Sequence, residues 1–194
     1  LGSVLGANGA IYAIKSELYK PLLKEMISDF VEPLEIFLQG MQVKYDPFAI
    51  AKEKVPKDGN SSFKRRERIV IRTVQSFICN RKLLVLLNPF KYPLQSFKLW
   101  SHKILRWLTG IVLIVFFIIN ALLFKQPTFR YFMYTQIFVY FCAFLGIVGH
   151  KYKFFPQSTL TYIIWYFFGS VYAMNKGLLR ALKGDKIVTW DTNR

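Results

Sequence analysis

The sequence predicts an α/β domain followed by membrane helices. Strand-like and helix-like segments alternate through residues 10–55, and three long uncharged apolar runs fill much of the second half. Between Lys64 and Arg106, eleven Lys/Arg residues accompany one acid, Glu67. Because cations gather on the cytoplasmic side of membrane-spanning segments, we expect residues 1–103 to lie in the cytoplasm or against its membrane face.

The chain carries a strong positive charge for its apolar content. Its 194 residues have a formal net charge of +16, and 53% are hydrophobic. Such an excess fits nucleic acid, anionic lipid or a phosphorylated substrate. We expect no nucleic-acid partner, because no zinc-ligand spacing or recognition-helix pattern occurs and the basic stretch leads directly into apolar runs.

The segments before the basic stretch predict short strands around one helix. Ala10–Ile14 reads as a buried strand, and Phe30–Leu38 has the apolar spacing of an amphipathic helix that ends at Gly40. Val43–Tyr45 alternates as a strand does, and Ala49–Val55 is the next strand candidate.

A basic helix is expected over residues 63–87. Its apolar residues share one face, and three arginines recur at spacings of three and four residues: Arg65, Arg68 and Arg72. Residues 83–106 then mix aromatic and cationic side chains, which is typical of helices in the lipid headgroup layer. The sequence therefore predicts an interfacial amphipathic region between the first domain, residues 1–82, and the membrane.

Two or three membrane spans are predicted within a membrane domain at 107–178, ahead of a basic tail at 179–194. The uncharged runs are 107–124, 131–149 and 154–175, and spanning takes roughly 20 apolar residues. Three spans would place the cations of the tail outside, against the positive-inside bias. If the third run is re-entrant or interfacial, the tail returns to the cytoplasm.

Several short motifs occur in a recognisable order. They are Gly6-Ala7-Asn8-Gly9-Ala10-Ile11-Tyr12-Ala13-Ile14-Lys15, Ser28-Asp29, Gly40 to Pro47, Arg65-Arg66-Glu67-Arg68-Ile69 and Val188 to Arg194. Together they resemble the C-terminal half of a membrane-bound family-2 glycosyltransferase, the inverting group that includes cellulose, chitin and hyaluronan synthases. For residues 1–82 the resemblance implies the acceptor-side part of a GT-A-type α/β catalytic domain.

The resemblance implies that Asp29 is the catalytic base. An inverting transferase needs a carboxylate that takes a proton from the acceptor hydroxyl. Without the resemblance, Asp29 reads as an acid that interacts favourably with a helix N-terminus. Asp46 and Glu53 are the competing carboxylates, and we interpret both as structural.

The resemblance assigns the leaving diphosphate to Arg65, Arg66 and Arg68. The family uses a Gln-x-x-Arg-Trp motif here; Arg68 fits, whereas Arg65 replaces the Gln and Ile69 replaces the Trp. The loss of the Trp weakens the case for polymerisation. The alternative for these arginines is a patch that binds anionic lipid.

Gly9 and Ala10 are expected to line the acceptor pocket, with a tight turn before a core strand as the alternative. No Asp-x-Asp motif occurs, and we expect no metal ligands in this chain. The resemblance implies Mg²⁺ or Mn²⁺ held by an N-terminal nucleotide-binding half, or by a companion subunit, without which we expect no activity.

We therefore expect a multi-pass protein of the cell membrane that transfers a sugar from a nucleotide diphosphate donor to a lipid or growing polysaccharide at the cytoplasmic face. The alternative function is a non-catalytic membrane adaptor whose basic helix binds anionic lipid or a partner.

Overall fold

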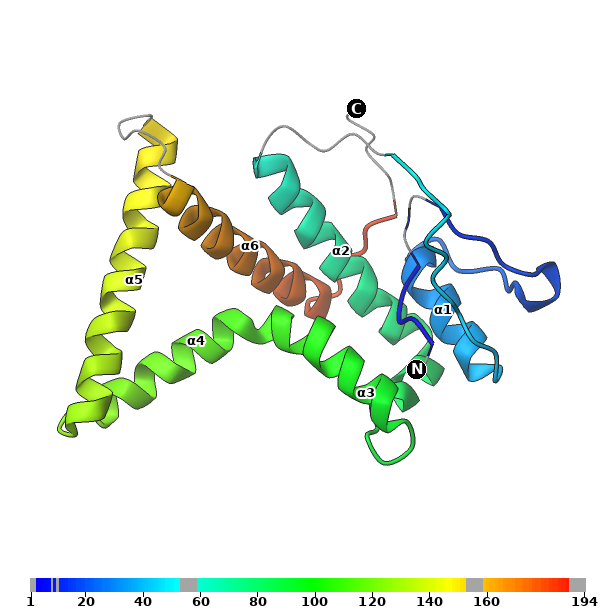
Figure 1. The fold of residues 1–194 in the computed structure, drawn as a ribbon, viewed down its shortest axis with the longest axis horizontal. Coiled ribbons are helices and arrows are strands. Elements are labelled where there is room, and N and C mark those ends of the chain that lie inside the picture. The colour runs from blue at the N-terminus through cyan, green and yellow to red at the C-terminus, as the bar shows by residue number, and fades with distance from the viewer. Residues whose placement is uncertain (1–2, 8, 10, 53–58, 153–158, 189–194) are drawn as a thin grey trace. The chain divides into compact units, whose positions relative to one another are not determined.

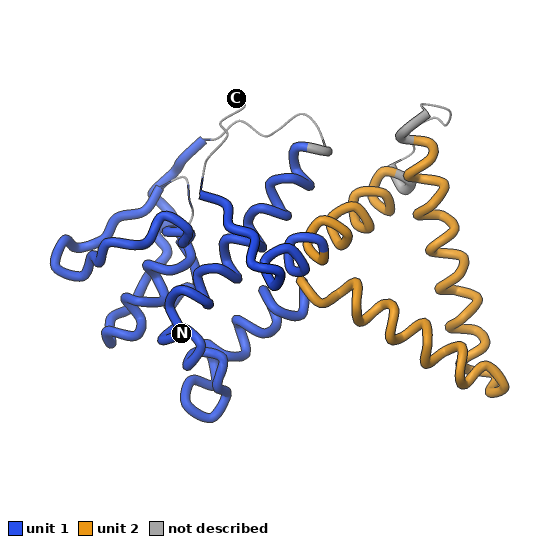
Figure 2. Tube along the Cα trace, turned by 180° about the vertical axis from the view of Figure 1, so that it is seen from behind, with its two compact units in different colours: residues 1–106, 176–194 blue, residues 107–175 orange. Residues whose placement is uncertain are grey.

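The computed structural model describes residues 3–7, 9, 11–52, 59–152 and 159–188. Its elements are the 3-10 helix η1 (Ser16–Leu18), α1 (Ser28–Leu38), α2 (Gly59–Cys79), the 3-10 helix η2 (Arg81–Leu87), α3 (Pro93–Leu99), the π-helical turn η3 (Trp100–Ile104), α4 (Leu105–Leu122), α5 (Pro127–Tyr152) and α6 (Thr159–Leu182) (Figure 1). The chain forms two compact units, residues 1–106 with 176–194 and residues 107–175 (Figure 2).

The predicted α/β class, and with it the acceptor-side GT-A-type domain, is wrong for the part of the chain that is described, which contains helices and no strand. Residues 11–14 form no regular secondary structure, and Ile11 is 52% exposed. Tyr45 is 80% exposed, and the segment from Ala49 is described only to Lys52.

The physical reason is that the alternation of apolar and polar residues along a segment gives it one apolar face but does not provide a neighbouring strand. A strand exists only through hydrogen bonds to a neighbouring segment. The nearest approach to a ladder is one backbone bond from Val4 N to Val43 O at 3.1 Å, beside a second bond from Val43 N to Ser3 Oγ. One such contact ties two segments together without forming a sheet.

The first unit is built on the packing of α1 against α2. The apolar face predicted for α1 is buried, with Val31 at 0% and Leu34 at 1% exposure. The Phe30 ring meets the edge of Phe77 from α2, with centroids 5.5 Å apart. Gly40 has φ +80°, and its N–H donates to Phe37 O, so this glycine ends α1 as expected.

The basic helix is shorter at its C-terminal end than the sequence predicted. It begins at Gly59 and ends at Cys79, and η2 continues the chain with Leu83 and Leu86 fully buried. A 3-10 helix has about three residues per turn, so Leu83 and Leu86 lie on the same, buried side of it. Pro93 then starts α3, where the missing N–H of a first-turn proline costs nothing.

The second unit consists of residues 107–175. In the described residues, two helices are long and apolar enough to cross a membrane, Pro93–Leu122 and Pro127–Gly149. Only 11% and 22% of their apolar cores are buried, unlike the core helices of a water-soluble domain. Gln136 of α5 joins them, donating to Leu113 O at 3.0 Å and accepting from Asn120 at 3.0 Å.

Candidate functional site

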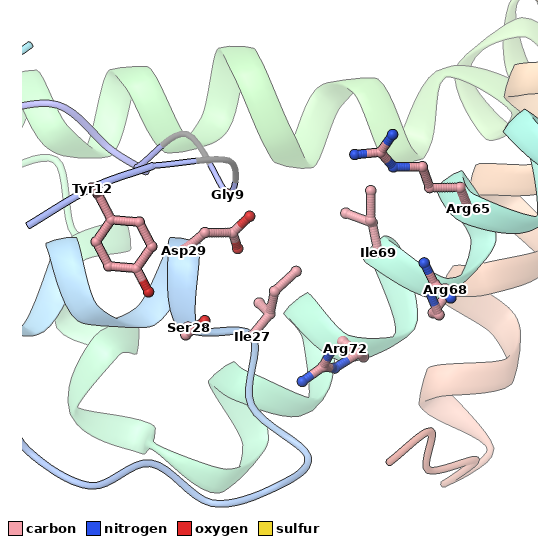
Figure 3. A pocket seen from close by; sticks show the side chains of 9 residues that line it. All are labelled: Gly9, Tyr12, Ile27, Ser28, Asp29, Arg65, Arg68, Ile69 and Arg72. Atoms are coloured by element: carbon pink, nitrogen blue, oxygen red, sulfur yellow. The ribbon is translucent and has the colours of Figure 1, made fainter. Parts of the chain in front are cut away.

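The first unit contains a pocket of about 220 Å³ between the start of α1 and the first half of α2. Figure 3 shows its lining: Gly9, Tyr12, Ile27, Ser28, Asp29, Arg65, Arg68, Ile69 and Arg72. Asp29 is the only carboxylate in this lining, and it lies opposite three guanidinium groups. Residues far apart in the sequence therefore meet as a carboxylate and a cluster of cations.

A proline shapes the wall that carries Asp29. In a regular helix the carbonyl of Asp29 would accept a hydrogen bond from the residue at position 33, but Pro33 has no N–H. The freed oxygen accepts from Ala7 N at 2.7 Å. Pro33 thus lets the glycine-rich opening segment attach to the first turn of α1, directly beside the carboxylate.

Gly9 lies against the carboxylate itself. A Cβ at this position would be 2.9 Å from Asp29 Oδ2, closer than real Cβ atoms approach an oxygen. Any larger residue would therefore displace the Asp29 side chain. The structure places Gly9 in the pocket wall, whereas Ala10 lies outside the described residues; that this wall receives the acceptor stays a prediction.

The opposite wall is the arginine face of α2. Arg65, Arg68 and Arg72 follow the helical spacing seen in the sequence, and all three line the pocket. Arg66, which the resemblance assigned to the same role, is not among the residues that line the pocket. The sequence therefore predicted two of the three pocket arginines, and Arg72 takes the place that Arg66 was expected to fill.

Arg72 also fixes the position of the carboxylate. Its Nη2 donates to Met26 O at 2.5 Å and approaches Lys24 O at 3.5 Å. Next to it, Ser76 Oγ accepts from Ile27 N at 3.1 Å. These bonds attach the segment that leads into α1 to the middle of α2, so one side chain contributes both charge and geometry.

Burial and charge act on Asp29 in opposite directions. Desolvation raises the pKa of its carboxyl above the ordinary value, while Lys103, Arg72 and Arg65, in that order, pull it down. In the part of the chain described, every ion pair involves Glu67 or Asp185, so Asp29 forms none. The carboxylate is therefore a base of raised proton affinity, and it is absent from the ion pairs formed among the described residues.

Two contributors to this environment were not predicted. For Arg72, the sequence signal was its four-residue spacing from Arg68, which places the two side chains on the same face of a helix. Lys103 gave no such signal, because it lies in η3, beyond two other helices, and reaches the neighbourhood of Asp29 only through folding.

The pocket does not suit a divalent metal ion. Mg²⁺ and Mn²⁺ take several oxygen ligands, usually including carboxylates. Here one carboxylate faces three guanidiniums that repel a cation, and no group of three or more His, Cys, Asp or Glu ligands occurs in the described ranges. The arrangement suits an anionic ligand whose reacting partner gives up a proton.

Comparison of the chain with protein-family models, with curated proteins and with solved structures finds no match.

Proposed function

We propose that this chain is the part of an inverting glycosyltransferase that carries the base and anchors the enzyme in the membrane. It would transfer a sugar from a nucleotide diphosphate donor to a lipid or growing polysaccharide at the cytoplasmic membrane face. The observation that carries the proposal is the pocket in which Asp29 faces Arg65, Arg68 and Arg72. This opposition of one base and several cations is what displacement of a diphosphate by a hydroxyl requires.

The reaction balances without further reagents. Asp29 takes the proton of the acceptor hydroxyl as that oxygen bonds to the anomeric carbon from the face opposite the leaving group. The bond from this carbon to the diphosphate oxygen breaks, and its electron pair leaves with the nucleotide. The arginines stabilise the new negative charge, and the configuration at carbon inverts.

The nucleotide and the metal are assigned to other residues. A pocket of about 220 Å³ suits a reacting hydroxyl and a diphosphate better than a whole nucleotide sugar. Mg²⁺ or Mn²⁺, which the resemblance implies, would be held together with the nucleotide by the donor-binding half or a companion subunit.

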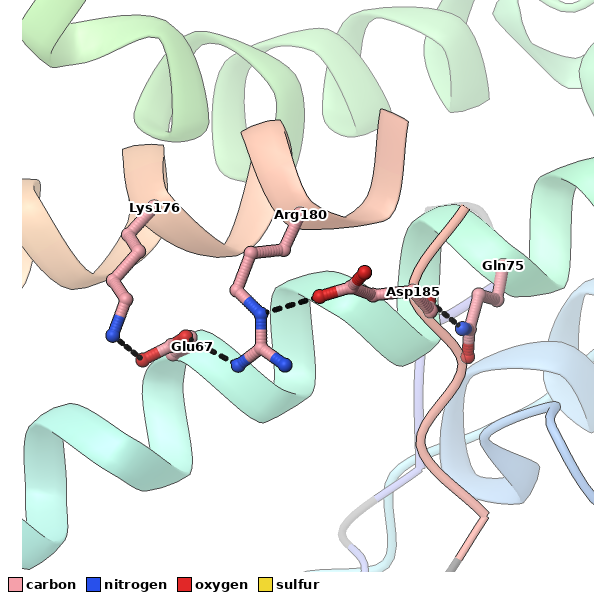
Figure 4. Close-up of polar contacts among 5 residues, drawn as sticks. All are labelled: Glu67, Gln75, Lys176, Arg180 and Asp185. Carbon is pink, nitrogen blue, oxygen red and sulfur yellow. Dashed lines mark hydrogen bonds and ion pairs between the residues drawn. The ribbon is translucent and has the colours of Figure 1, made fainter. Parts of the chain in front are cut away.

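The membrane topology that we propose follows from the number of times the chain crosses the bilayer. Lys176 and Arg180, at the end of α6, pair with Glu67 of α2 at 3.3 and 2.8 Å, so this end belongs to the first unit (Figure 4). If α4 and α5 each cross the bilayer, α6 begins on the side where the first unit lies. Because it also ends there, α6 is re-entrant or interfacial, and the basic tail stays cytoplasmic.

Binding of a simple anion tests the arginine wall on this chain alone. We expect inorganic pyrophosphate, measured by calorimetry in detergent, to bind about 10-fold more weakly after Arg68→Gln, the loss of one charge-assisted contact. Lys82→Gln removes an exposed charge outside the pocket and should change nothing. Equal losses in the two variants would contradict an arginine site and indicate non-specific attraction.

Transfer itself needs the complete enzyme. With a panel of uridine and guanosine diphosphate sugars, Asp29→Asn should abolish transfer while nucleotide binding survives. Unchanged turnover would remove Asp29 from the chemistry.

The adaptor function has an observation of its own in its favour. Large apolar side chains are exposed from η2 to the first residue of η3, a stretch that also contains Arg81, Lys82 and Lys91: Leu84, Phe90, Leu94, Phe97 and Trp100. Such a surface suits the headgroup layer of an anionic bilayer. In liposome flotation, adaptor binding through charge should weaken steeply with salt, whereas integral anchoring should not.

A further inference from the structure

Lys103 comes to the site from a π-helical turn. This turn, η3, joins α3 to α4, and such turns are frequent at functional sites because they re-aim side chains. Lys103 Nζ lies 5.0 Å from the centroid of the Phe30 ring, within the range of a cation–π contact. Phe30 is the residue that follows Asp29.

The Phe30 ring is a fixed platform for this contact. It is 2% exposed and meets the Phe77 ring edge-on at 5.5 Å. Because the ring cannot move without disturbing the core of α1 and α2, the ammonium of Lys103 has a defined position. That position lies beside the first turn of α1, where Asp29 is.

Burial raises the pKa of the Asp29 carboxyl, and Lys103 is the first of the charges that lower it, ahead of Arg72 and of Arg65. The pKa of Lys103 is itself lowered, mainly by burial and next by Arg106, and Asp29 partly offsets this. From the opening segment, Tyr12 also lines the pocket; its pKa is raised mainly by burial, a hydrogen bond with Ser28 lowers it, and Glu32 and Asp29 raise it by smaller amounts.

We propose that Lys103 is a positioning residue for the base: from the turn before α4, its ammonium keeps the Asp29 carboxylate ionised and leaves its oxygens open to an acceptor hydroxyl. The proposal rests on the proposed role of Asp29. It assigns to the start of the first membrane helix a part in the chemistry, in addition to anchoring.

The physical need for such a residue comes from the burial of the pocket. A base in a desolvated site tends to hold a proton and is then unable to accept one. A cation in direct contact would restore ionisation but would cover the carboxylate. A cation held on the Phe30 ring provides the field without forming an ion pair, and Asp29 is absent from the ion pairs of the described residues.

The test is a titration of Asp29 in the purified chain in detergent micelles. Aspartate labelled with ¹³C at the carboxyl gives a signal for each side chain, and Asp29→Asn identifies the one that belongs to Asp29. We expect Lys103→Met to raise the pKa of Asp29, whereas Lys103→Arg keeps it near that of the wild type. Lys82→Met is the matched control for loss of an exposed lysine and should leave the titration unchanged.

A folding defect is recognisable because it acts in the opposite direction. Unfolding removes the burial that raises the pKa of Asp29, so it lowers the titration midpoint, whereas loss of Lys103 alone raises it. Lys103→Gln is measured as a second uncharged variant. A midpoint that is unchanged or lower in both uncharged variants, while their circular dichroism stays that of the wild type, would overturn the proposal. Asp29→Asn in the complete enzyme tests the proposed function separately, because the titration requires no turnover.

Discussion

The Nη2 atom of Arg72 lies 2.5 Å from the main-chain oxygen of Met26, just before the helix that carries Asp29. One guanidinium therefore lines the pocket and also holds the segment that delivers the carboxylate. Charge and geometry at this site are coupled through a single side chain.

Replacement of Arg72 should consequently cost stability as well as charge. We expect Arg72→Gln to lower the free energy of unfolding by about 1–2 kcal/mol, the value of a partly exposed hydrogen bond from a charged donor. Arg65→Gln removes a charge from the same pocket but no main-chain tie, and thermal unfolding in detergent should barely change. Equal destabilisation by the two changes would contradict the coupling.

Asp29 should make the fold less stable at neutral pH than at acid pH. Burial raises the pKa of the Asp29 carboxyl in the folded chain above its value in the unfolded chain, so at a pH between these two pKa values the folded chain binds more protons. The protonated carboxyl therefore favours folding most at a pH below the unfolded pKa. This stabilisation is lost as the pH rises through the folded pKa.

Asp29→Asn should therefore be more stable than the wild type at pH 7. We expect the difference in melting temperature to shrink as the pH is lowered below the ordinary aspartate range. A wild-type chain that is the more stable of the two at neutral pH would show that the cations outweigh desolvation.

Gly177 allows α6 to approach α2 closely. A Cβ at this position would lie 2.7 Å from the main-chain oxygen of Glu67, and backbone cannot rotate away. We expect Gly177→Ala to destabilise the chain by about 1–3 kcal/mol, although alanine favours helices. Leu179→Ala, at a position of α6 that is 57% exposed, is the control and should change the melting temperature little.

Gln136 should hold α4 and α5 together within the second unit. It is 8% exposed and bonds to Leu113 O, Asn120 and Tyr140. Gln136→Leu leaves Asn120 without this partner, and we expect a loss of about 1 kcal/mol in a steric-trap measurement of helix association. Phe138→Leu, at a position that is 66% exposed, should leave association intact.

The proposed topology predicts which residues a membrane-impermeant maleimide reaches. In sealed vesicles, native Cys79 and a separate Lys183→Cys variant should react from the same side, and Gln126→Cys from the other. Each reporter is used with the remaining cysteines changed to serine. Reaction of Lys183→Cys together with Gln126→Cys would mean that α6 crosses the membrane.

The glycosyltransferase resemblance implied the wrong fold. Four of the residues that it singled out, Asp29, Gly9, Arg65 and Arg68, line one pocket, and their roles in sugar transfer stay a prediction. The described residues contain no strand at 11–14 or 43–45, where the single backbone bond between Val4 and Val43 does not extend into a ladder.

Local patterns in the sequence were enough to place most of the helices. The 3.6-residue apolar spacing of α1, the left-handed Gly40 that ends it and the proline that begins α3 act within a few residues. The long uncharged runs likewise predicted α4 and α5. These features follow from backbone sterics and from the apolarity of single segments.

Only the tertiary structure determined the composition of the site. Arg72 replaces Arg66 because packing of α1 on α2 decides which helix face meets Asp29. Lys103 joins it through the Phe30 ring, a contact between distant segments that no local pattern encodes. The predicted strand pairing was wrong for the same reason. Strand pairing and the composition of the pocket both depend on which segments meet when the apolar faces of the chain are buried.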